Sequence, residues 1–382
     1  MKELSQRVSQ APKSQIRELF SLAAGRSDVI SLGIGQPDFK TPEPIIKAIT
    51  KALEDGITMY APTRGNSELL ELIAKKIREQ NKIDVGVENV IVSNGGSQAI
   101  TFAFASLFNQ GDELILCSPN FISYFYCGAF FGLKVVESKR NDDFSPNLDD
   151  IKSKITSKTK AILINSPNNP TGYAFTKKEI EEIVGMVIEN DLYLISDEVY
   201  ENYLYDGTVH ISPGSLNGMQ ERTITLNAMS KLFSATGIRL GYVAAPAHII
   251  DLMEKYQQYT IAGTNHAAQF GFIEALKMDK GFFKPILKEF NSRRLLCYKR
   301  LSEIGFDVVK PKGAFYIMPG ISKFGSDSMK FSKKVMQEKA VAIVPGAIFG
   351  SYAADRLRMS YATSMNNLET AMDRIEDFVK SL

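Results

Sequence analysis

The sequence predicts an α/β protein in which a mainly parallel sheet is flanked by helices and a smaller α+β domain lies beside it. Strand-like and helix-like patterns alternate from about residue 45 to about residue 280, which is typical of a parallel sheet with helices on both faces. Four of the strand-like runs end in polar residues, where open α/β sheets bind their ligands. From Phe282 onward, charged helical patterns such as 289–301 mix with short apolar runs such as 341–344. This mixture of helical patterns and short strand-like runs indicates the smaller α+β domain.

The first of these strands is predicted over 90–94, and a glycine-rich turn follows it. Gly95-Gly96-Ser97 comes directly before the long apolar segment 98–108, which favours a helix. A turn of this kind leaves free backbone N–H groups at the positive end of the helix dipole, and its glycines allow close approach of the backbone. The pattern therefore predicts an anion site. Ser97 between a strand and a helix also approximates the nucleophile turn of a serine hydrolase.

Two further strands end in side chains that suit a binding site. The strand predicted over 160–165 runs into Ser166-Pro167-Asn168-Asn169-Pro170-Thr171-Gly172, a turn-rich stretch with amides at its tip. The strand predicted over 191–196 ends in Asp197-Glu198-Val199-Tyr200. Asn169 is also explained as a turn asparagine before proline, and Asp197 as a helix N-cap.

The fourth strand, predicted over 223–227, leads to Ser230-Lys231 and, eight residues after the lysine, to Arg239. Lysine forms an imine with the aldehyde of pyridoxal phosphate, and the arginine fork suits a phosphate group. The alternative is that Lys231 and Arg239 are two ordinary surface cations among the 45 Lys and Arg of the chain. Their place beyond the carboxyl end of a strand favours the cofactor site.

Composition is that of an ordinary globular protein. The chain of 382 residues is 44% apolar and 23% charged. Its net charge of +2 lacks the strong positive charge that is typical of nucleic-acid-binding proteins. Cys117, Cys127 and Cys297 predict free thiols in a reducing compartment. The histidines at 210, 248 and 266 are scattered, so we expect no metal site. No signal-peptide pattern and no membrane span is found, and we expect a cytoplasmic protein.

The chain resembles the class I aminotransferases, which are pyridoxal-phosphate-dependent enzymes of fold type I, and it is most similar to their archaeal and bacterial aspartate and aromatic amino acid branch. The likeness spans nearly the whole chain. Its landmarks in order are Gly35-Gln36-Pro37-Asp38-Phe39, Tyr60 before Gly65, Gly95-Gly96-Ser97-Gln98-Ala99, Asn169-Pro170-Thr171-Gly172, Asp197-Glu198-Val199-Tyr200, Ser230-Lys231, Gly237-Ile238-Arg239, Gly313-Ala314-Phe315-Tyr316 and Arg358-Met359-Ser360-Tyr361-Ala362-Thr363. The resemblance implies a seven-stranded-type sheet in a large domain over 45–280, with 1–44 and 281–382 forming the small domain.

The resemblance also implies the catalytic roles. Lys231 forms the internal aldimine with pyridoxal 5'-phosphate and then moves a proton between the substrate and the cofactor. Asp197 keeps the pyridine nitrogen protonated, because an opposite charge favours the charged form. Tyr200 and Asn169 donate hydrogen bonds to the phenolate oxygen of the cofactor. These roles predict transfer of an amino group from an L-amino acid, aspartate or aromatic, to a 2-oxo acid such as 2-oxoglutarate.

The remaining cofactor contacts follow from the same likeness. The turn Gly95, Gly96 and Ser97 holds the phosphate together with Arg239 and Ser230, and Tyr60 contacts it from the neighbouring subunit of a homodimer with shared active sites. The common pattern has a serine three residues before the lysine, where this chain has Ala228, so the phosphate contacts of that loop differ. Phe121 takes the place of the usual tryptophan that stacks on the cofactor ring, although it also fits a core aromatic residue.

For the substrate, the resemblance implies that Arg358 binds the α-carboxylate in bidentate fashion, with Gly35 and Asn169 beside it. Arg356 lies on the same face of the predicted strand, and only the following Ser360-Tyr361-Ala362-Thr363 favours Arg358. Arg64 is the candidate for the side-chain carboxylate of an acidic substrate. An aromatic side chain needs an apolar pocket, for which Phe20, Tyr124 and the residues around Ile261 are candidates.

Two alternatives remain open. A serine hydrolase needs an acid followed by a histidine at loop ends, and neither His248 nor His266 has that setting. A pyridoxal-phosphate-dependent C–S or C–N lyase or synthase has much the same skeleton, because one fold serves several reactions. A keto acid product that forms only when an amino acceptor is present distinguishes transamination from elimination.

Overall fold

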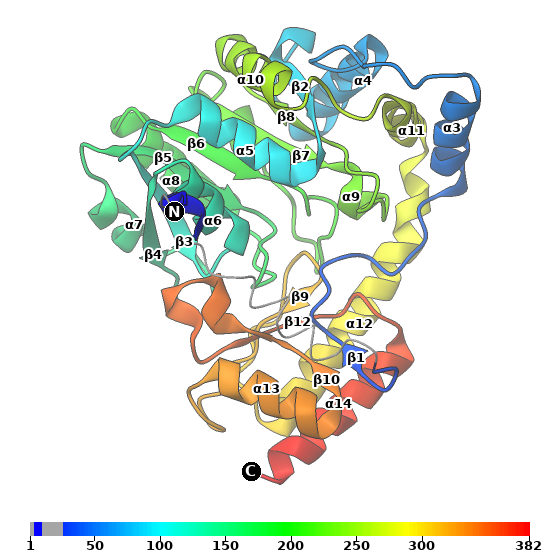
Figure 1. Ribbon diagram of the computed structural model, residues 1–382. Helices are drawn as coiled ribbons and strands as arrows, with labels where there is room; N and C mark the ends of the chain where they lie inside the picture. Colours follow the sequence, from blue (N-terminus) through cyan, green and yellow to red (C-terminus); the bar gives the residue numbers. More distant parts are fainter. Residues whose placement is uncertain (1–3, 10–25) are drawn as a thin grey trace.

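A seven-stranded sheet forms the centre of the computed structural model, which describes residues 4–9 and 26–382 of the chain (Figure 1). Its strands, in spatial order, are β2 (Val90–Ser93), β8 (Gly241–Ala244), β7 (Thr223–Ala228), β6 (Tyr193–Asp197), β5 (Thr159–Asn165), β3 (Glu113–Ser118) and β4 (Lys134–Lys139). Strand β8 runs antiparallel to its neighbours β2 and β7, and the other pairs are parallel. The predicted mainly parallel sheet is confirmed, and all four named strands are present.

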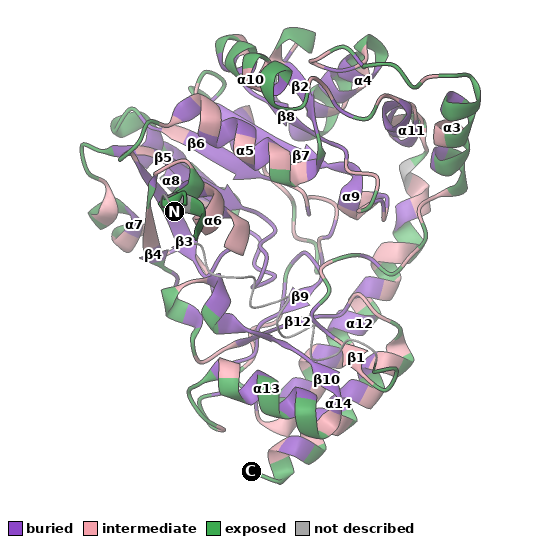
Figure 2. Ribbon diagram, viewed as in Figure 1, coloured by how far each residue is buried: buried purple, intermediate pink, exposed green. Residues whose placement is uncertain are grey.

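Helices cover both faces of this sheet because its central strands are apolar on both sides (Figure 2). On one face, α5 (Gly95–Leu107) and α10 (Ala247–Thr260) share one apolar core with Leu163 and Ile195. On the other face, α7 (Leu148–Lys154) and α8 (Lys177–Glu189) pack on Ile162 and Leu194, which are the preceding residues of the same strands. Successive side chains of a strand point to opposite faces, so each strand contributes to two cores.

Helix α8 illustrates how the local sequence defines an element. Thr176 caps its first turn: the Glu179 N–H donates to Oγ1 of Thr176 at 3.3 Å, and the Thr176 N–H donates to Oε2 of Glu179 at 2.7 Å. Downstream, Ile180, Ile183 and Val187 are buried at helical spacing. The capping box sets the start of the helix, and the apolar stripe holds the helix against the sheet.

The other helical elements connect these layers. They are the α-helices α1 (Gln6–Ser9), α3 (Glu43–Glu54), α4 (Ser67–Lys76), α6 (Ile122–Phe130), α9 (Met229–Leu232) and α11 (His266–Lys277), the π-helical turn η1 (Ile77–Asn81), and the 3-10 turns η2 (Val87–Asn89), η3 (Pro213–Ser215), η4 (Lys280–Phe282), η5 (Gly346–Phe349) and η6 (Ser351–Ala353).

A smaller set of strands and helices lies below the sheet in Figure 1. It contains the antiparallel sheet β11 (Val344–Pro345), β12 (Leu357–Ser360) and β9 (Tyr316–Ile317), and the helices α12 (Phe283–Ile304), α13 (Ser328–Lys339) and α14 (Met365–Lys380). Strand β1 (Ile30–Ser31) comes from the beginning of the chain and pairs in parallel with β10 (Val341–Ala342). This pairing supports the division into 45–280 and 1–44 with 281–382, which stays a prediction.

Cys117, Cys127 and Cys297 are all free, as predicted, and Cys117 and Cys297 are buried. Burial raises the pKa of the Cys297 thiol to about 12 and that of Cys127 to about 11, so neither thiol is activated as a nucleophile. Within residues 4–9 and 26–382, every helix is too short or too polar to cross a membrane.

Candidate active site

A cavity of about 440 Å³ opens at the carboxyl ends of β5, β6 and β7. Side chains from the sheet, from the segment after β1 and from β12 meet there. The residues singled out from the sequence that line it are Gly35, Gly96, Ser97, Phe121, Tyr124, Asn169, Asp197, Tyr200, Ser230, Lys231, Arg239 and Arg358. Positions spread over more than 300 residues thus form one site, as expected for the carboxyl edge of an open sheet.

Lys231 lies on the short helix α9, directly after β7, and its amine points into the cavity. Its Nζ donates to the backbone carbonyl of Gly35 at 2.6 Å. Burial, together with the positive charges of Arg358 and Arg239, lowers the pKa of Lys231 to about 8, although Asp197 opposes the shift. The neutral amine is therefore a minority at pH 7 but far more abundant than at the ordinary pKa of lysine, and it is the form that attacks an aldehyde or accepts a proton.

Asp197 is the last residue of β6, and its buried carboxylate has two donors in the described part of the chain. The N–H of Val199 donates to Oδ1 at 3.1 Å, and the hydroxyl of Tyr124 donates to Oδ2 at 2.7 Å. Burial raises the pKa of Asp197, while both hydrogen bonds act in the opposite direction. The carboxylate lines the cavity and is placed to pair with a cationic ring nitrogen.

Asn169 and Tyr200 line the same cavity as this carboxylate. The N–H of Asn169 donates to Oδ1 of Asn165 at 2.8 Å, which fixes the turn after β5. The hydroxyl of Tyr200 lies 2.8 Å from that of Tyr316, a residue of the landmark 313–316 to which sequence patterns assigned no role. Both Asn169 and Tyr200 are buried, so their polar groups are held in defined positions at the cavity wall.

Arg358 extends from β12 into the same cavity, and it is 4% exposed. Its Nη1 donates to Oδ1 of Asn169 at 3.2 Å and its Nη2 to the carbonyl of Gly33, while its buried Nε has no hydrogen-bond partner among the described residues. Its neighbour Arg356 instead lies 3.4 Å from Asp307 and outside the cavity. The guanidinium of Arg358 is thus the one directed at the site, and it suits a carboxylate.

The phosphate end of the predicted site is formed by the first turn of α5 and by Arg239. Gly95 has φ of +73°, and a Cβ built on it would lie 2.5 Å from Nη2 of Arg239. The residue must therefore be glycine for the guanidinium to pack against the first turn of α5. Arg239 itself is held by a hydrogen bond of 2.8 Å from Nη1 to the carbonyl of Thr236. Helix dipole and guanidinium together give an anion site.

These groups fit pyridoxal 5'-phosphate on the chemistry of the donor set. An amine of lowered pKa, a buried carboxylate and a glycine cradle with an arginine lie around one cavity. Phe121 precedes α6 and lines the same cavity, where an aromatic face can cover a ring. Lys231 would hold the aldehyde, Asp197 the ring nitrogen, and the α5 turn with Arg239 the phosphate.

Tyr60 and Arg64, both singled out from the sequence, lie outside the cavity. Tyr60 is 88% exposed, and the guanidinium of Arg64 pairs with Asp251 at 2.8 Å and Glu254 at 2.6 Å. The roles given to Tyr60 and Arg64 require a second subunit, so they stay predictions. Phe20 lies outside the described residues, and Ile261 is 40% exposed and outside the cavity.

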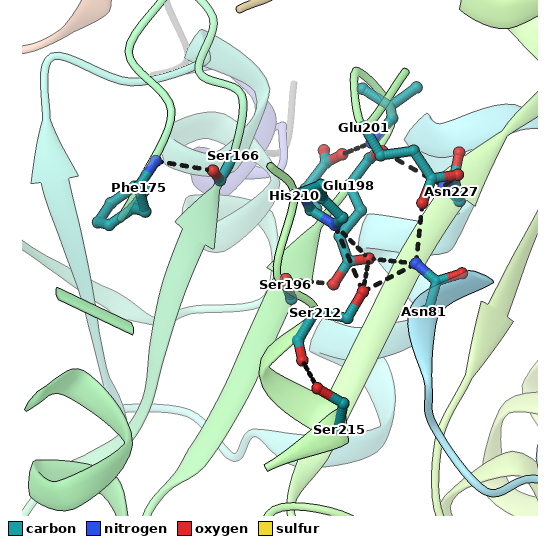
Figure 3. Close-up of polar contacts among 12 residues, drawn as sticks. Asn81, Ser166, Phe175, Ser196, Glu198, Glu201, His210, Ser212, Ser215 and Asn227 are labelled. Carbon is teal, nitrogen blue, oxygen red and sulfur yellow. Dashed lines mark hydrogen bonds and ion pairs between the residues drawn. The ribbon is translucent and has the colours of Figure 1, made fainter. Parts of the chain in front are cut away.

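A buried polar cluster around Glu198, the residue after Asp197, was missed from the sequence (Figure 3). We name it the Glu198 cluster. Its members are Lys76, Asn81, Ser196, Glu198, Glu201, His210, Ser212 and Asn227. The carboxylate of Glu198 is fully buried and accepts from Asn81 at 2.9 Å, Ser212 at 2.6 Å and Ser196 at 2.9 Å. The cluster joins the π-helical turn η1 to the ends of β6 and β7.

His210 is not isolated from other ligand-type side chains, although the expected absence of a metal site stays a prediction. Its Nε2 lies 2.9 Å from Oε2 of Glu198, and the ligand atoms of Glu198, Glu201 and His210 all lie within 4.8 Å of one another. Sequence spacing missed it because the loop after β6 folds back. The carboxylates already accept hydrogen bonds from the Lys76 ammonium and the Asn81 amide, so a metal ion would have to displace these donors.

The hydrolase alternative finds no support in this geometry. Among the described residues that line the cavity there is no histidine, so Ser97 has no base beside it. The serine sits instead on the first turn of α5, with its neighbours Gly95 and Gly96. This placement suits an anion contact.

Comparisons with known proteins agree with the geometry. The family model for aminotransferase class I and II matches residues 27–375. The chain is 44% identical to the aspartate aminotransferase of Pyrococcus abyssi, over 99% of this chain and 98% of that protein. It is 41% identical to aromatic-amino-acid aminotransferase 2 of Thermococcus litoralis, with the same coverage.

A solved structure, the aromatic aminotransferase of Pyrococcus horikoshii, superposes with a TM-score of 0.91 at 44% identity, over 96% of this chain and 99% of that one. The fold, the chemistry of the site and the sequence identity over almost the full length all indicate the same enzyme family. The chain belongs to the class I and II aminotransferases and is a pyridoxal-phosphate-dependent transaminase.

Proposed function

We propose that this transaminase moves the amino group of aspartate, of an aromatic L-amino acid, or of both, to a 2-oxo acid, with 2-oxoglutarate as the acceptor. The proposal rests above all on the meeting of Lys231, Asp197, Arg239 and Arg358 around one cavity. The substrate classes are those in the names of the relatives from Pyrococcus abyssi and Thermococcus litoralis.

Bound pyridoxal phosphate supplies an electron sink that stabilises negative charge on the substrate α-carbon. Lys231 is the base: its neutral Nζ takes the proton from the α-carbon, carries it as an ammonium group and releases it on the cofactor side. The pKa of about 8 favours this role, because both protonation states are accessible near neutral pH. Asp197 holds a proton on the ring nitrogen, which strengthens the electron sink.

Arg358 orients the substrate. It would take the α-carboxylate in bidentate fashion through two N–H groups on one edge of its guanidinium, of which Nε has no partner among the described residues. Asn169 already contacts this guanidinium, and it would lie beside both the carboxylate and the phenolate oxygen of the cofactor, where Tyr200 is the second donor. Gly35 closes the opposite side and contacts Lys231.

At the other end, Gly95, Gly96 and Ser97 offer the N–H groups of the first turn of α5 to the phosphate, with Arg239 and Ser230 beside them. Ala228 lines the cavity where the common pattern of the family has a serine, so this chain uses one hydroxyl less. Tyr60 of the partner subunit would complete the phosphate contacts.

We infer a homodimer with shared active sites. Tyr60 is 88% exposed and Tyr259 80% exposed in the single chain, an unusual setting for large aromatic side chains that a partner surface would cover. Mixing two inactive variants tests this. Lys231→Ala dimers and Tyr60→Ala dimers, unfolded and refolded together, should regain activity in mixed dimers that carry one intact site. Activity no higher than the sum of the separate variants would contradict the shared site.

A cytoplasmic location is part of the proposal. Three free thiols, two of them buried, suit a reducing compartment. Fractionation of the native host, with the enzyme followed by its transaminase activity, tests this location. Activity in a secreted or membrane fraction would argue against it.

For acidic substrates we keep Arg64 as the candidate for the second carboxylate, acting across the dimer. Its Nε donates to Glu254 and its Nη2 to both Glu254 and Asp251, so among the described residues only Nη1 stays available for a substrate carboxylate. Arg64→Ala should then lower kcat/KM for aspartate and leave that for tyrosine unchanged. Equal values for aspartate in variant and wild type would exclude Arg64 from the substrate site.

The direct test of the proposed function is a panel of amino donors with 2-oxoglutarate. Aspartate, tyrosine and phenylalanine are each incubated with the holoenzyme, and the keto acid made from each donor is measured with and without the acceptor. Product that appears only with 2-oxoglutarate supports transamination. Ammonia and keto acid released without an acceptor would point to a lyase.

A further inference from the structure

Tyr124 contacts both residues that we propose to hold the cofactor ring. It lies on α6, it is 0% exposed, and its hydroxyl donates to Oδ2 of Asp197 at 2.7 Å. Its ring packs edge-on against Phe121, with centroids 5.6 Å apart and an interplanar angle of 85°. Tyr124 thus connects Phe121, which would stack on the cofactor ring, with Asp197, which would pair with the ring nitrogen.

We propose that Tyr124 is a positioning residue of the transaminase, which keeps the proton of the Asp197–pyridine pair on the ring nitrogen and fixes Phe121 for stacking. The inference rests on the proposed roles of Asp197 and Phe121. It gives Tyr124 a function that differs from lining a pocket for aromatic substrates.

A buried carboxylate is costly to keep ionised, and Tyr124 offsets part of that cost. Burial raises the pKa of Asp197, which would draw the shared proton away from the ring and onto the carboxylate. A hydrogen bond donated to the ionised carboxylate acts against this, and the Tyr124 hydroxyl is the largest such contribution. The Val199 N–H provides a weaker one on the other oxygen, at 3.1 Å.

Tyr124 can provide this bond at every physiological pH. Burial, with the neighbouring charge of Asp197, raises the pKa of the Tyr124 phenol well above its ordinary value. The phenol therefore stays protonated and remains a donor. Because Oδ2 receives the Tyr124 bond on one side, its remaining lone pair is free to face the cavity that Asp197 lines.

The packing of Tyr124 against Phe121 supports its second role. Phe121 precedes α6, and the N–H of Tyr124 donates to its carbonyl at 3.1 Å, so the two residues share the first turn of the helix. An edge-to-face pair restricts the Phe121 ring to one orientation. A change in the Tyr124 hydroxyl alone should leave this pair in place.

Tyr124→Phe separates the two roles, since it removes the hydroxyl and keeps the ring. The matched control is Tyr126→Phe, on the same helix, whose ring does not line the cavity. Three quantities are measured for each holoenzyme: the pH dependence of the cofactor absorption band, the dissociation constant of pyridoxal phosphate from fluorescence titration of apoenzyme, and kcat and KM.

We expect Tyr124→Phe to lower kcat about tenfold, as for the loss of one hydrogen bond to a charged group, with KM changed less than about twofold. The absorption band should shift toward that of a cofactor with a neutral ring nitrogen, and the cofactor should bind more weakly. Tyr126→Phe should match the wild type. In an Asp197→Asn background, Tyr124→Phe should have no further effect on cofactor affinity, because the carboxylate it acts through is absent.

A wild-type band and a kcat within about twofold of the wild type would overturn the proposal, as would an equal loss of affinity in the Asp197→Asn background. Either result leaves the transaminase assignment untouched, because that assignment depends on the wild-type enzyme. Absence of cofactor capture by the wild type would instead overturn the proposed function itself.

Discussion

The Nζ atom of Lys231 donates to the backbone carbonyl of Gly35 at 2.6 Å, which joins the reactive amine on α9 to the segment after β1. The contact crosses from the large sheet to the part of the chain that pairs with β10. It holds the amine inside the cavity near Arg358 and Arg239, whose charges add to burial in lowering the pKa of the lysine. The contact with Gly35 therefore determines both where the amine lies and which charges lower its pKa.

The pH dependence of cofactor capture follows from that pKa. Only the neutral amine attacks the aldehyde, and the pKa of Lys231 is lowered to about 8, so capture by apoenzyme should accelerate as the pH rises through about 8. Stopped-flow absorbance at several pH values measures this, with Lys231→Ala as the control that captures no cofactor. A midpoint near 10.5, the ordinary value for lysine, would show that the site does not perturb the amine.

Arg358 and Arg356 form a natural pair for testing the carboxylate site. Arg358→Lys should lower kcat/KM about 10- to 100-fold, because a lysine offers a point charge in place of a bidentate fork. Arg356→Lys should leave kcat/KM within about twofold, since Arg356 lies by Asp307 outside the cavity. Steady-state kinetics with one good donor measures both. The opposite ranking would reassign the substrate carboxylate to Arg356.

Gly95 is the most constrained position of the phosphate end. Gly95→Ala puts a Cβ where it would lie 2.5 Å from Nη2 of Arg239, at a φ of +73° that side chains rarely adopt. We expect the dissociation constant of pyridoxal phosphate to rise at least about tenfold. Gly237→Ala, whose added Cβ would meet no heavy atom of the described chain within 4 Å, is the control and should bind the cofactor normally. Unchanged affinity in Gly95→Ala would exclude this turn from the phosphate site.

The Glu198 cluster predicts a pH-dependent stability. Burial would lower the pKa of His210, but the charges of Glu198 and Glu201 outweigh it and raise the pKa. The stabilisation by the His210 cation is therefore fully present below the ordinary value of 6.5 and is lost as the pH rises through the raised pKa.

Urea unfolding of His210→Gln measures this effect. The variant should be less stable than the wild type at about pH 6, and the difference should shrink at about pH 9, because the neutral histidine contributes no charge there. His248→Gln, at an exposed position, should show no such trend. A constant difference between His210→Gln and wild type at both pH values would mean that His210 does not change its charge between them, and would contradict this account.

The parts of the site that follow strand ends are the parts that sequence patterns predict. Asp197, Asn169 and Lys231 each come at or after the end of a buried apolar run, and parallel strands bring such positions to one edge. Resemblance added Arg358, which lies on a short strand that the local pattern alone could not distinguish from the strand position of Arg356. The same alternation of patterns predicted the sheet and its flanking helices.

What the sequence did not predict depends on contacts across long distances in the chain. The sequence predicts Tyr124 only as an aromatic residue that lines a substrate pocket. Folding brings its hydroxyl to Asp197, which lies 73 residues later in the chain. Asn81, in the π-helical turn, likewise meets Glu198 117 residues later. No local periodicity marks such pairs, because hydrogen bonds between side chains of different elements leave no regular spacing. Tyr60 and Arg64 require a second chain, whose surface no pattern within one subunit describes.

The absorbance spectrum of the purified protein with pyridoxal phosphate, recorded before and after single amino acids are added, is the decisive measurement for the Lys231 site. We predict a cofactor band that is absent in Lys231→Ala, that shifts to the aminated form of the cofactor with aspartate, glutamate or tyrosine, and that returns with 2-oxoglutarate. A protein that develops no band with pyridoxal phosphate, or a band that no amino acid shifts, would contradict the assignment of Lys231 and the transamination built on it.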